Sequence, residues 1–403
     1  MGIDIDIASQ DQWVRGVPHD DFARLRREAP VYRHPGVEPG HPEFFWALTR
    51  HHDVRAANRD SETFSSETGG VQMWNPDPET HGLFKNMIDT DPPDHTRLRR
   101  LVNRGFTPRI VATFEQHYHE VTRQLIDKAI AKGSFDFVTE IAAELPLIAI
   151  AELLGIPQSE RALIFEWTNK MVGSSDPEYV LDENEPLEAA TQLYQYANQL
   201  GAERLAEPRD DIVTKLITEV DGDALGAHEF EVFILLLTVA GNETTRNAIT
   251  HGLLGLLENP DQMERLRAGS RELLDTAVDE MIRWASPVIH FRRTATRDVE
   301  IEGTTIAAGD PVVLFYISAN RDEAAFENPF RFDVGREPND HLGFGGGGPH
   351  FCLGANLARI EMRVMFEELL ARTASIEQTA PAQRLRSNFI NGIKHLPVDV
   401  TPA

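Results

Sequence analysis

A run of about 30 residues from His228 to Leu257 constrains the fold more than any other part of the chain. It reads HEFEVFILLLTVAGNETTRNAITHGLLGLL and ends before Pro260. As a helix it would be about 45 Å long, and its first half is apolar on every side, which is typical of a helix enclosed by other elements. Its apolar stretch, about 12 residues, is too short to span a membrane. The sequence therefore predicts a long helix inside a large core.

The remaining periodicity is mainly helical, with a small β component. An acidic cap and first-turn prolines at Asp91–Asp94 favour a helix start. Further helices are expected at 271–284 and 355–373, and strands at 45–49, 297–306 and 311–316. Because no linker, charge block or repeat divides the chain, we expect one mainly α domain spanning residues 1–403. Segments 66–90 and 171–190 have little periodicity and are predicted to be loops over a pocket.

The charge balance argues against nucleic acid and anionic membranes as partners. Lys and Arg total 39 against 64 Asp and Glu, a formal net charge of -25, and such a chain repels phosphate. Residues Thr96 to Ile110 run against this trend, with five arginines and no acid in TRLRRLVNRGFTPRI. This basic segment is either a solvated helix face or a site for an anionic partner or anionic cofactor groups.

The N-terminal sequence and the cysteine count indicate a soluble protein of the cytoplasm. MGIDIDIASQDQW has neither the basic start nor the apolar run of a secretory signal or membrane anchor. A single cysteine cannot form an internal disulfide, which agrees with a reducing compartment.

The segment from His341 to Glu361, HLGFGGGGPHFCLGANLARIE, contains the only cysteine, Cys352. Four successive glycines, 345–348, form a loop that other backbone can approach closely. Cys352 then precedes Gly354 and a predicted helix, so it lies at the positive end of the helix dipole, near unpaired N–H groups that stabilise a thiolate. Such a thiolate suits a haem iron that cleaves O–O bonds.

The glycine-rich loop also matches two other kinds of site. Gly343, Gly345 and Gly348 match G-x-G-x-x-G, but the preceding 333–340 is polar rather than a buried strand, and the acid expected about 20 residues later would fall inside a helix. A lone cysteine is most often a buried structural residue. Four adjacent glycines are not needed for that role.

Polar residues interrupt the long helix at Ala240-Gly241-Asn242-Glu243-Thr244-Thr245. A buried acid is costly unless it is paired or functional. Glycine weakens a helix, and threonine can bond back to the preceding turn and bend it. The segment is therefore either a solvent-facing turn or a groove for O2 and water, in which Glu243 and Thr244 supply protons.

Taken together, these motifs resemble those of the cytochromes P-450. Gly348, His350, Cys352 and Gly354 occupy positions of the family's haem-binding signature, and the interruption of the helix resembles its oxygen-binding segment, A-G-x-E/D-T. The resemblance implies a mainly α, triangular fold that binds haem b. It also implies that Cys352 is the axial iron ligand, that Ala240 and Gly241 lie at the haem, and that Glu243 and Thr244 relay protons. In the family an aromatic residue precedes the cysteine by seven positions; here Gly345 holds that place and Phe344 precedes it.

The resemblance also assigns roles to residues that spacing alone leaves open. It places His95, Arg99, Arg293 and His350 around the haem propionates, since arginine suits carboxylates. Glu280 and Arg283, otherwise an ordinary surface pair, resemble the family's E-x-x-R and would share a buried network with a later arginine. We expect that arginine to be Arg331, with Arg336 as the second choice. An acidic ferredoxin, itself reduced by a ferredoxin reductase, is expected to dock on three other arginines: Arg97, Arg100 and Arg104.

Other classes of site find no support in the sequence. His117 and His119 have no third ligand at zinc spacing, HEFEV at His228 is not H-E-x-x-H, and G-x-S-x-G is absent. The presence of Glu243–Thr244 favours O2 and two electrons over peroxide as the oxidant. It also argues against a haem-thiolate sensor or lipid carrier.

Several stretches are similar to the actinobacterial sterol side-chain terminal hydroxylases. They are DHTRLRRLVNRGFTPR, MVGSSDPEY, DDIVTKL, TVAGNETTRNAIT, NRDEAAFENPF and NGIKHLPVD, whereas GFGGGGPHFCLGANLAR is shared with the hydroxylases of methyl-branched lipids. The resemblance thus implies a monomeric hydroxylase of a sterol side chain. A hydroxylase of methyl-branched fatty acids or terpenes, or a tailoring enzyme of secondary metabolism, would use the same residues. Val239, Ala240, Ile289 and Phe291 are expected to line its apolar pocket.

Overall fold

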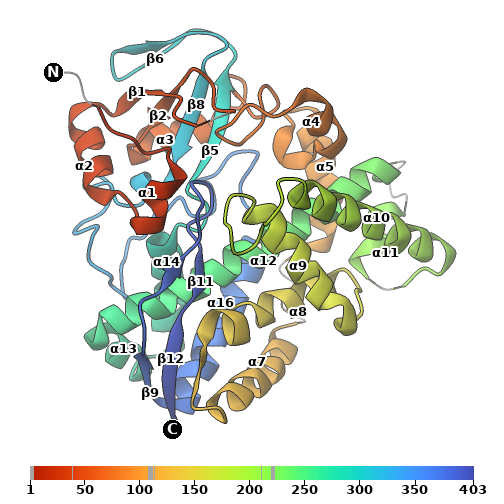
Figure 1. Cartoon of the computed structure of the whole chain (residues 1–403), viewed down its shortest axis with the longest axis vertical. Coiled ribbons are helices and arrows are strands. Elements are labelled where there is room, and N and C mark those ends of the chain that lie inside the picture. The colour runs from red at the N-terminus through yellow and green to blue at the C-terminus, as the bar shows by residue number, and fades with distance from the viewer. Residues whose placement is uncertain (1–3, 39, 108–111, 113, 210, 219–222) are drawn as a thin grey trace.

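The predicted long helix is present and lies in the middle of the helical part of the molecule (Figure 1). The computed structural model describes residues 4–38, 40–107, 112, 114–209, 211–218 and 223–403. Helix α12 (Ala227–Glu258) has 32 residues, so it is about 48 Å long. At its start the Glu229 carboxylate accepts a hydrogen bond from the N–H of the N-cap residue, Gly226, at 2.9 Å. Asn259 and Pro260 end it and begin the next helix.

Helices surround α12 on most sides. Those that pack against it include α8, α9, α10, α14 and α16. The α-helices have these bounds: α1 (Gln10–Arg15), α2 (His19–Glu28), α3 (His51–Arg59), α4 (Pro78–Phe84), α5 (Asp94–Val102), α7 (Glu115–Ile130), α8 (Glu144–Leu153), α9 (Arg161–Val172), α10 (Glu185–Ala206), α11 (Ile212–Ile217), α12, α13 (Pro260–Arg267), α14 (Arg271–Ala285), α15 (Tyr316–Ala319) and α16 (Ala355–Arg372).

The β component consists of small sheets. Five strands form the sheet β1-β2-β8-β5-β3, in which only the β2–β8 pair is parallel, and three form β4-β12-β9. The five-stranded sheet lies at one end of the molecule, beside α2 and α3 (Figure 1). The strands have these bounds: β1 (Val31–Pro35), β2 (Phe44–Leu48), β3 (Phe64–Ser65), β4 (Ser134–Asp136), β5 (His290–Ala295), β6 (Val299–Ile301), β7 (Thr304–Ile306), β8 (Pro311–Phe315), β9 (Thr373–Gln378), β10 (Gln383–Arg384), β11 (Ile393–His395) and β12 (Pro397–Pro402).

The largest apolar core forms between α12 and the helices around it. Ile234, Ile249 and Leu253 of α12 have no exposed surface and share this core with Phe366 of α16. Two smaller cores lie against the five-stranded sheet. Because burial of apolar surface is the main stabilising term, the core between the helices fixes α12, which carries Glu243 and Thr244, relative to α16, which begins just after Cys352.

The expected elements match the observed ones to within a few residues. Segment 297–306 is a hairpin that turns at Gly303, where φ is +74°. The segment 66–90 contains α4 and a short 3-10 helix (Met87–Asp89), so it is less irregular than expected. No helix in the described part of the chain combines the length and the apolar character that crossing a bilayer requires.

Candidate active site

The glycine loop before the cysteine is pressed against α3. Gly345 to Gly348 all have positive φ, between +63° and +103°. A Cβ on Gly348 would lie 2.7 Å from the carbonyl oxygen of Asn58 and 2.9 Å from the Cα of Arg59, so glycine is required there. The Asn58 amide donates to the carbonyls of Gly345 and Gly347, the latter at 2.9 Å. Contacts with α3 therefore hold the loop in place.

Cys352 lies where this loop meets α16. Its N–H donates to the Phe344 carbonyl at 3.0 Å, and Gly354 is the N-cap of α16. The residue has exposed surface, yet enough protein surrounds the sulfur for burial to raise the pKa of the thiol. Its exposed surface therefore faces a recess inside the protein. The Gly354 N–H and the guanidinium of Arg99 oppose that rise in pKa, so the thiolate has donors but needs a cation to be fully stabilised.

The extra residue of the loop leaves Phe344 as the aromatic beside the cysteine. Gly345 only makes the turn, whereas Phe344 accepts from Cys352 through its carbonyl and packs its ring against the core. The Arg359 guanidinium lies 4.5 Å from the centre of that ring. Phe344, one position earlier than the family's aromatic residue, is thus bonded to the backbone of Cys352.

Four cationic or donor side chains converge beside the recess, and we call them the cationic cluster: His95, Arg99, Arg293 and His350. The rings of His95 and His350 are 4.2 Å apart. The buried Nε2 of His95 has no partner, and Arg99 has neither a hydrogen-bond nor an ion-pair partner among the described residues. Burial and neighbouring arginines lower the pKa of His95 to about 4 and that of His350 to about 2. A group with two carboxylates would relieve this repulsion, so the cluster fits the propionates of haem.

One face of α12 is open in the middle of an otherwise buried helix. Leu236, Val239, Ala240 and Thr244 keep exposed surface, while the flanking turns are buried. Thr244 donates from its hydroxyl to the Ala240 carbonyl at 2.6 Å, the expected back-bond. The helix nevertheless runs through this segment without interruption. A Cβ on Gly241 would lie 2.4 Å from Cδ1 of Ile150, so Gly241 allows α8 to pack closely, a role distinct from the expected contact with the cofactor.

Glu243 is held in a buried network that the sequence interpretation missed. It is 1% exposed and pairs through Oε2 with Arg246, which in turn donates to Asn169 at 2.8 Å. Burial raises the pKa of Glu243, against the lowering effect of Arg246. Its Oε1 is buried and has no hydrogen-bond partner among the residues that the structure describes. The i, i+3 spacing of Glu243 and Arg246 on one helix was the available signal.

A cavity of about 480 Å³ reaches the open face of α12. Three of the residues expected in an apolar pocket, Val239, Ala240 and Phe291, line it, together with Glu243 and Thr244. The expectation for Ile289 was wrong: that side chain is fully buried in a core of the five-stranded sheet. Its neighbour Val288 lines the cavity instead. The two segments predicted to lie over a pocket both contribute to the lining, which also includes Trp74, Ile88, Met171, Leu235, Phe389 and Ile390.

Comparison with known proteins decides the family. Residues 183–387 match a model of the cytochrome P-450 family. Two curated relatives extend this match to almost the whole chain. A steroid C26-monooxygenase of Rhodococcus jostii is 43% identical and covers 99% of this chain and 85% of its own. A methyl-branched lipid omega-hydroxylase of Mycobacterium tuberculosis is 45% identical and covers 98% of this chain and 94% of its own. The chain belongs to the cytochrome P-450 family.

Solved structures agree with this assignment. A cytochrome P-450 of Mycobacterium marinum in complex with pseudoionone superposes with a TM-score of 0.93, at 39% identity, over 99% of each chain. One from Novosphingobium aromaticivorans gives a TM-score of 0.89 at 32% identity, over 98% of this chain and 97% of its own. The protein is thus a cytochrome P-450 monooxygenase with haem b as its cofactor and a mainly α fold.

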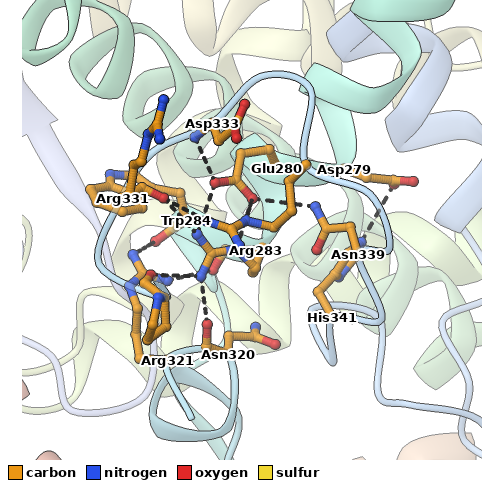
Figure 2. Close-up of polar contacts among 12 residues, drawn as sticks. Asp279, Glu280, Arg283, Trp284, Asn320, Arg321, Arg331, Asp333, Asn339 and His341 are labelled. Carbon is orange, nitrogen blue, oxygen red and sulfur yellow. Dashed lines mark hydrogen bonds and ion pairs between the residues drawn. The ribbon is translucent and has the colours of Figure 1, made fainter. Parts of the chain in front are cut away.

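In this cytochrome P-450 the E-x-x-R motif anchors the segment that leads to the cysteine loop (Figure 2). Arg283 and Glu280 are fully buried, 2.7 Å apart, and Arg283 also donates to the carbonyls of Asn320 and Pro329. Asn320 in turn accepts from the Leu342 N–H at 2.7 Å. The network thus fixes the chain ten residues before Cys352.

The third member of this network is Arg336, so the first choice, Arg331, was wrong. Arg336 pairs with Glu280 at 3.0 Å. Arg331 contributes its main-chain carbonyl to Arg336 and Arg283, while its exposed side chain points away from Glu280 (Figure 2). The turn after Asn328 places position 336, rather than 331, over the buried acid.

The arginines of the basic segment of this cytochrome P-450 are less available to bind a partner than the sequence suggests. Arg97 pairs with Asp223 and Glu229, and Arg100 pairs with Asp223 at 2.8 Å. Arg104 also has an interaction partner, and Arg109 lies outside the described residues. Asp223 lies just before α12 and Glu229 in its first turn, far from the basic segment in sequence, so a count along that segment could not reveal them.

Proposed function

We propose that this cytochrome P-450 hydroxylates the terminal methyl of a sterol side chain with O2 and two electrons from a ferredoxin. The observation that carries the proposal is the cavity. It is largely apolar and reaches the open face of α12, next to Glu243 and Thr244, which we call the acid–alcohol pair. The relatives named for steroid C26 and for methyl-branched lipids support attack on a terminal carbon. Terminal oxidation of a methyl-branched lipid is the second candidate, because that relative is as similar as the steroid one.

The residues of the chain hold and orient the reacting groups. Haem b, when bound, supplies the oxidation chemistry, while the protein controls access and orientation. Cys352 would hold the iron, the cationic cluster would hold the propionates, and the apolar lining, with Val288 and Phe291 close to the sheet, would orient the hydrocarbon. Apolar walls also exclude water from the reacting carbon.

Glu243 and Thr244 would deliver protons to the reaction. The unpartnered Oε1 of Glu243 belongs to a residue that lines the cavity, and the Thr244 hydroxyl is one residue further along α12. Arg246 holds the other carboxylate oxygen. Because Arg246 favours the charged form and burial the neutral form, Glu243 can accept and release a proton without leaving its position.

Replacement of Thr244 by alanine is expected to uncouple electron use from hydroxylation. Without the hydroxyl, proton delivery is misdirected, so NADH consumption should continue while hydrogen peroxide replaces most of the hydroxylated product, a loss of about tenfold or more in coupling. The measurement is the ratio of product to NADH in the reconstituted system. Thr250→Ala is the matched control, since Thr250 makes the same back-bond at 2.9 Å outside the cavity. Unchanged coupling in Thr244→Ala would refute the proton-relay role.

Binding of a sterol enone tests the substrate class. We expect a saturable shift of the Soret band to shorter wavelength when the enone is titrated into the ferric protein, because an apolar ligand in the cavity displaces water from the iron. A shift with a methyl-branched lipid alone would favour the second candidate. If neither ligand binds, both proposals for the substrate fail.

A further inference from the structure

The cavity of this cytochrome P-450 carries more acidic than basic groups. Asp77, Asp89 and Glu243 line it, the last of them paired with Arg246, and among the described residues Arg386 is the only arginine or lysine on the lining. Asp89 is 8% exposed, and burial raises the pKa of its carboxyl to about 6, so it remains mostly charged at neutral pH. The protein as a whole has a net charge of -25. A substrate carboxylate would therefore find acidic surroundings and no available cation in the cavity unless Arg386 were free to bind it.

Arg386 is not free, because residues of two segments, α1 and the loop after α9, hold its guanidinium at the edge of the cavity. The Arg386 guanidinium donates to Asp11 Oδ1 at 2.7 Å, to Gln10 Oε1 at 2.9 Å and to the Ser175 carbonyl at 3.0 Å. Its charge is thus already matched by the carboxylate of Asp11, which is 74% exposed.

A second buried arginine, Arg292, does not replace it. Among the described residues Arg292 has no acidic partner, and it donates to the Trp74 carbonyl at 3.2 Å and to the Asn75 side chain at 2.9 Å. These bonds fix the segment 69–75 that covers the cavity. Arg292 itself is not one of the residues that line the cavity, so a ligand would meet the segment rather than the guanidinium.

The cavity does offer hydrogen bonding to an uncharged group. Gln72 lines it, and its Oε1 is buried without a partner among the described residues. A side-chain amide both donates and accepts, so it suits a hydroxyl or a ketone. A buried polar atom left unpaired is costly, and such a ligand would remove that cost.

We propose that the cavity selects substrates whose polar end is an uncharged hydroxyl or ketone, and that Asp11 enforces this choice by occupying Arg386. The inference rests on the proposed function and narrows its substrate class: sterols and branched alcohols fit, whereas ionised fatty acids are disfavoured.

The test compares three ligands with one branched hydrocarbon skeleton: a primary alcohol, the carboxylic acid and its methyl ester. Dissociation constants for the haem-loaded protein are measured at pH 7.5 by calorimetry, with the Soret shift as a second readout. We expect the alcohol and the ester to bind at least tenfold more tightly than the acid, about 1.4 kcal/mol. Because any apolar cavity disfavours a carboxylate, a variant is needed to isolate the role of Asp11.

Asp11→Asn provides this variant at an exposed position. It should strengthen binding of the acid at least threefold and leave the alcohol unchanged, because the Arg386 charge becomes available. Asp20→Asn, which removes an exposed acid of α2 that is not part of the cavity, should change neither. Equal affinities for acid and alcohol in the natural protein, or an acid affinity that Asp11→Asn does not alter, would overturn the inference but not the proposed function. Failure of all three ligands and the sterol to bind would overturn both.

Discussion

Replacement of Cys352 by serine is expected to abolish hydroxylation, with activity reduced by at least about a thousandfold. A serine hydroxyl is a far weaker donor to iron than a thiolate and cannot provide the same electron push to the oxygen. The structure offers no substitute, since Cys352 is the only cysteine of the chain. The measurements are product formation and the carbon monoxide difference spectrum of the reduced protein, which should lose the long-wavelength Soret band that marks a thiolate ligand.

The control for this substitution is Phe351→Tyr. Phe351 is adjacent and 38% exposed, so its replacement leaves the loop and the sulfur in place and should retain the long-wavelength band. A Cys352→Ser protein that still formed product at the natural rate would contradict the assignment of the iron ligand.

Replacement of Arg283 by alanine is expected to have the largest effect on stability. It would leave the fully buried carboxylate of Glu280 without its bidentate partner and free the carbonyls of Asn320 and Pro329. Breaking a buried pair in this way costs about 3–5 kcal/mol, much of the roughly 5–15 kcal/mol that stabilises a typical protein. We expect little folded, haem-loaded protein, and a strongly lowered urea midpoint in what remains.

Arg331→Ala is the matched control for that experiment. It removes a side chain of the same kind from the same part of the molecule but keeps the main-chain carbonyl that Arg283 and Arg336 use. A surface substitution of this type changes the free energy of unfolding by about 0.5 kcal/mol or less. If Arg331→Ala destabilised the protein as much as Arg283→Ala, the assignment of Arg336 to the network would be wrong.

The parts of the site that the sequence predicts are those specified by local pattern. The apolar run and the first-turn prolines determine α12 and α5 from within their own segments, and the four glycines before Cys352 mark a loop that must approach other backbone. The acid–alcohol pair was recognisable because charge is rare within a buried helix. One domain over residues 1–403 and a monomeric state remain predictions.

The incorrect expectations concern contacts between distant segments. Whether Val288 or Ile289 faces the cavity depends on how the chain enters β5, since Ile289 bonds to the Phe389 carbonyl and turns into the sheet core. Whether Arg331 or Arg336 pairs with Glu280 depends on the path of the turn between them. The pairing of Arg97 with Asp223 depends on how distant segments pack in the folded protein. Which of two adjacent side chains faces the cavity cannot be read from composition or from the spacing of residues.

Turnover with isotopically labelled O2 tests the central claim most directly. The reconstituted cytochrome P-450 is supplied with a sterol enone, NADH, a ferredoxin and its reductase, and the product is identified by mass spectrometry. We predict a single hydroxyl on the terminal carbon of the side chain, carrying one labelled oxygen atom, while the second atom leaves as water. A product without label, or hydroxylation confined to the ring system, would contradict the proposed function.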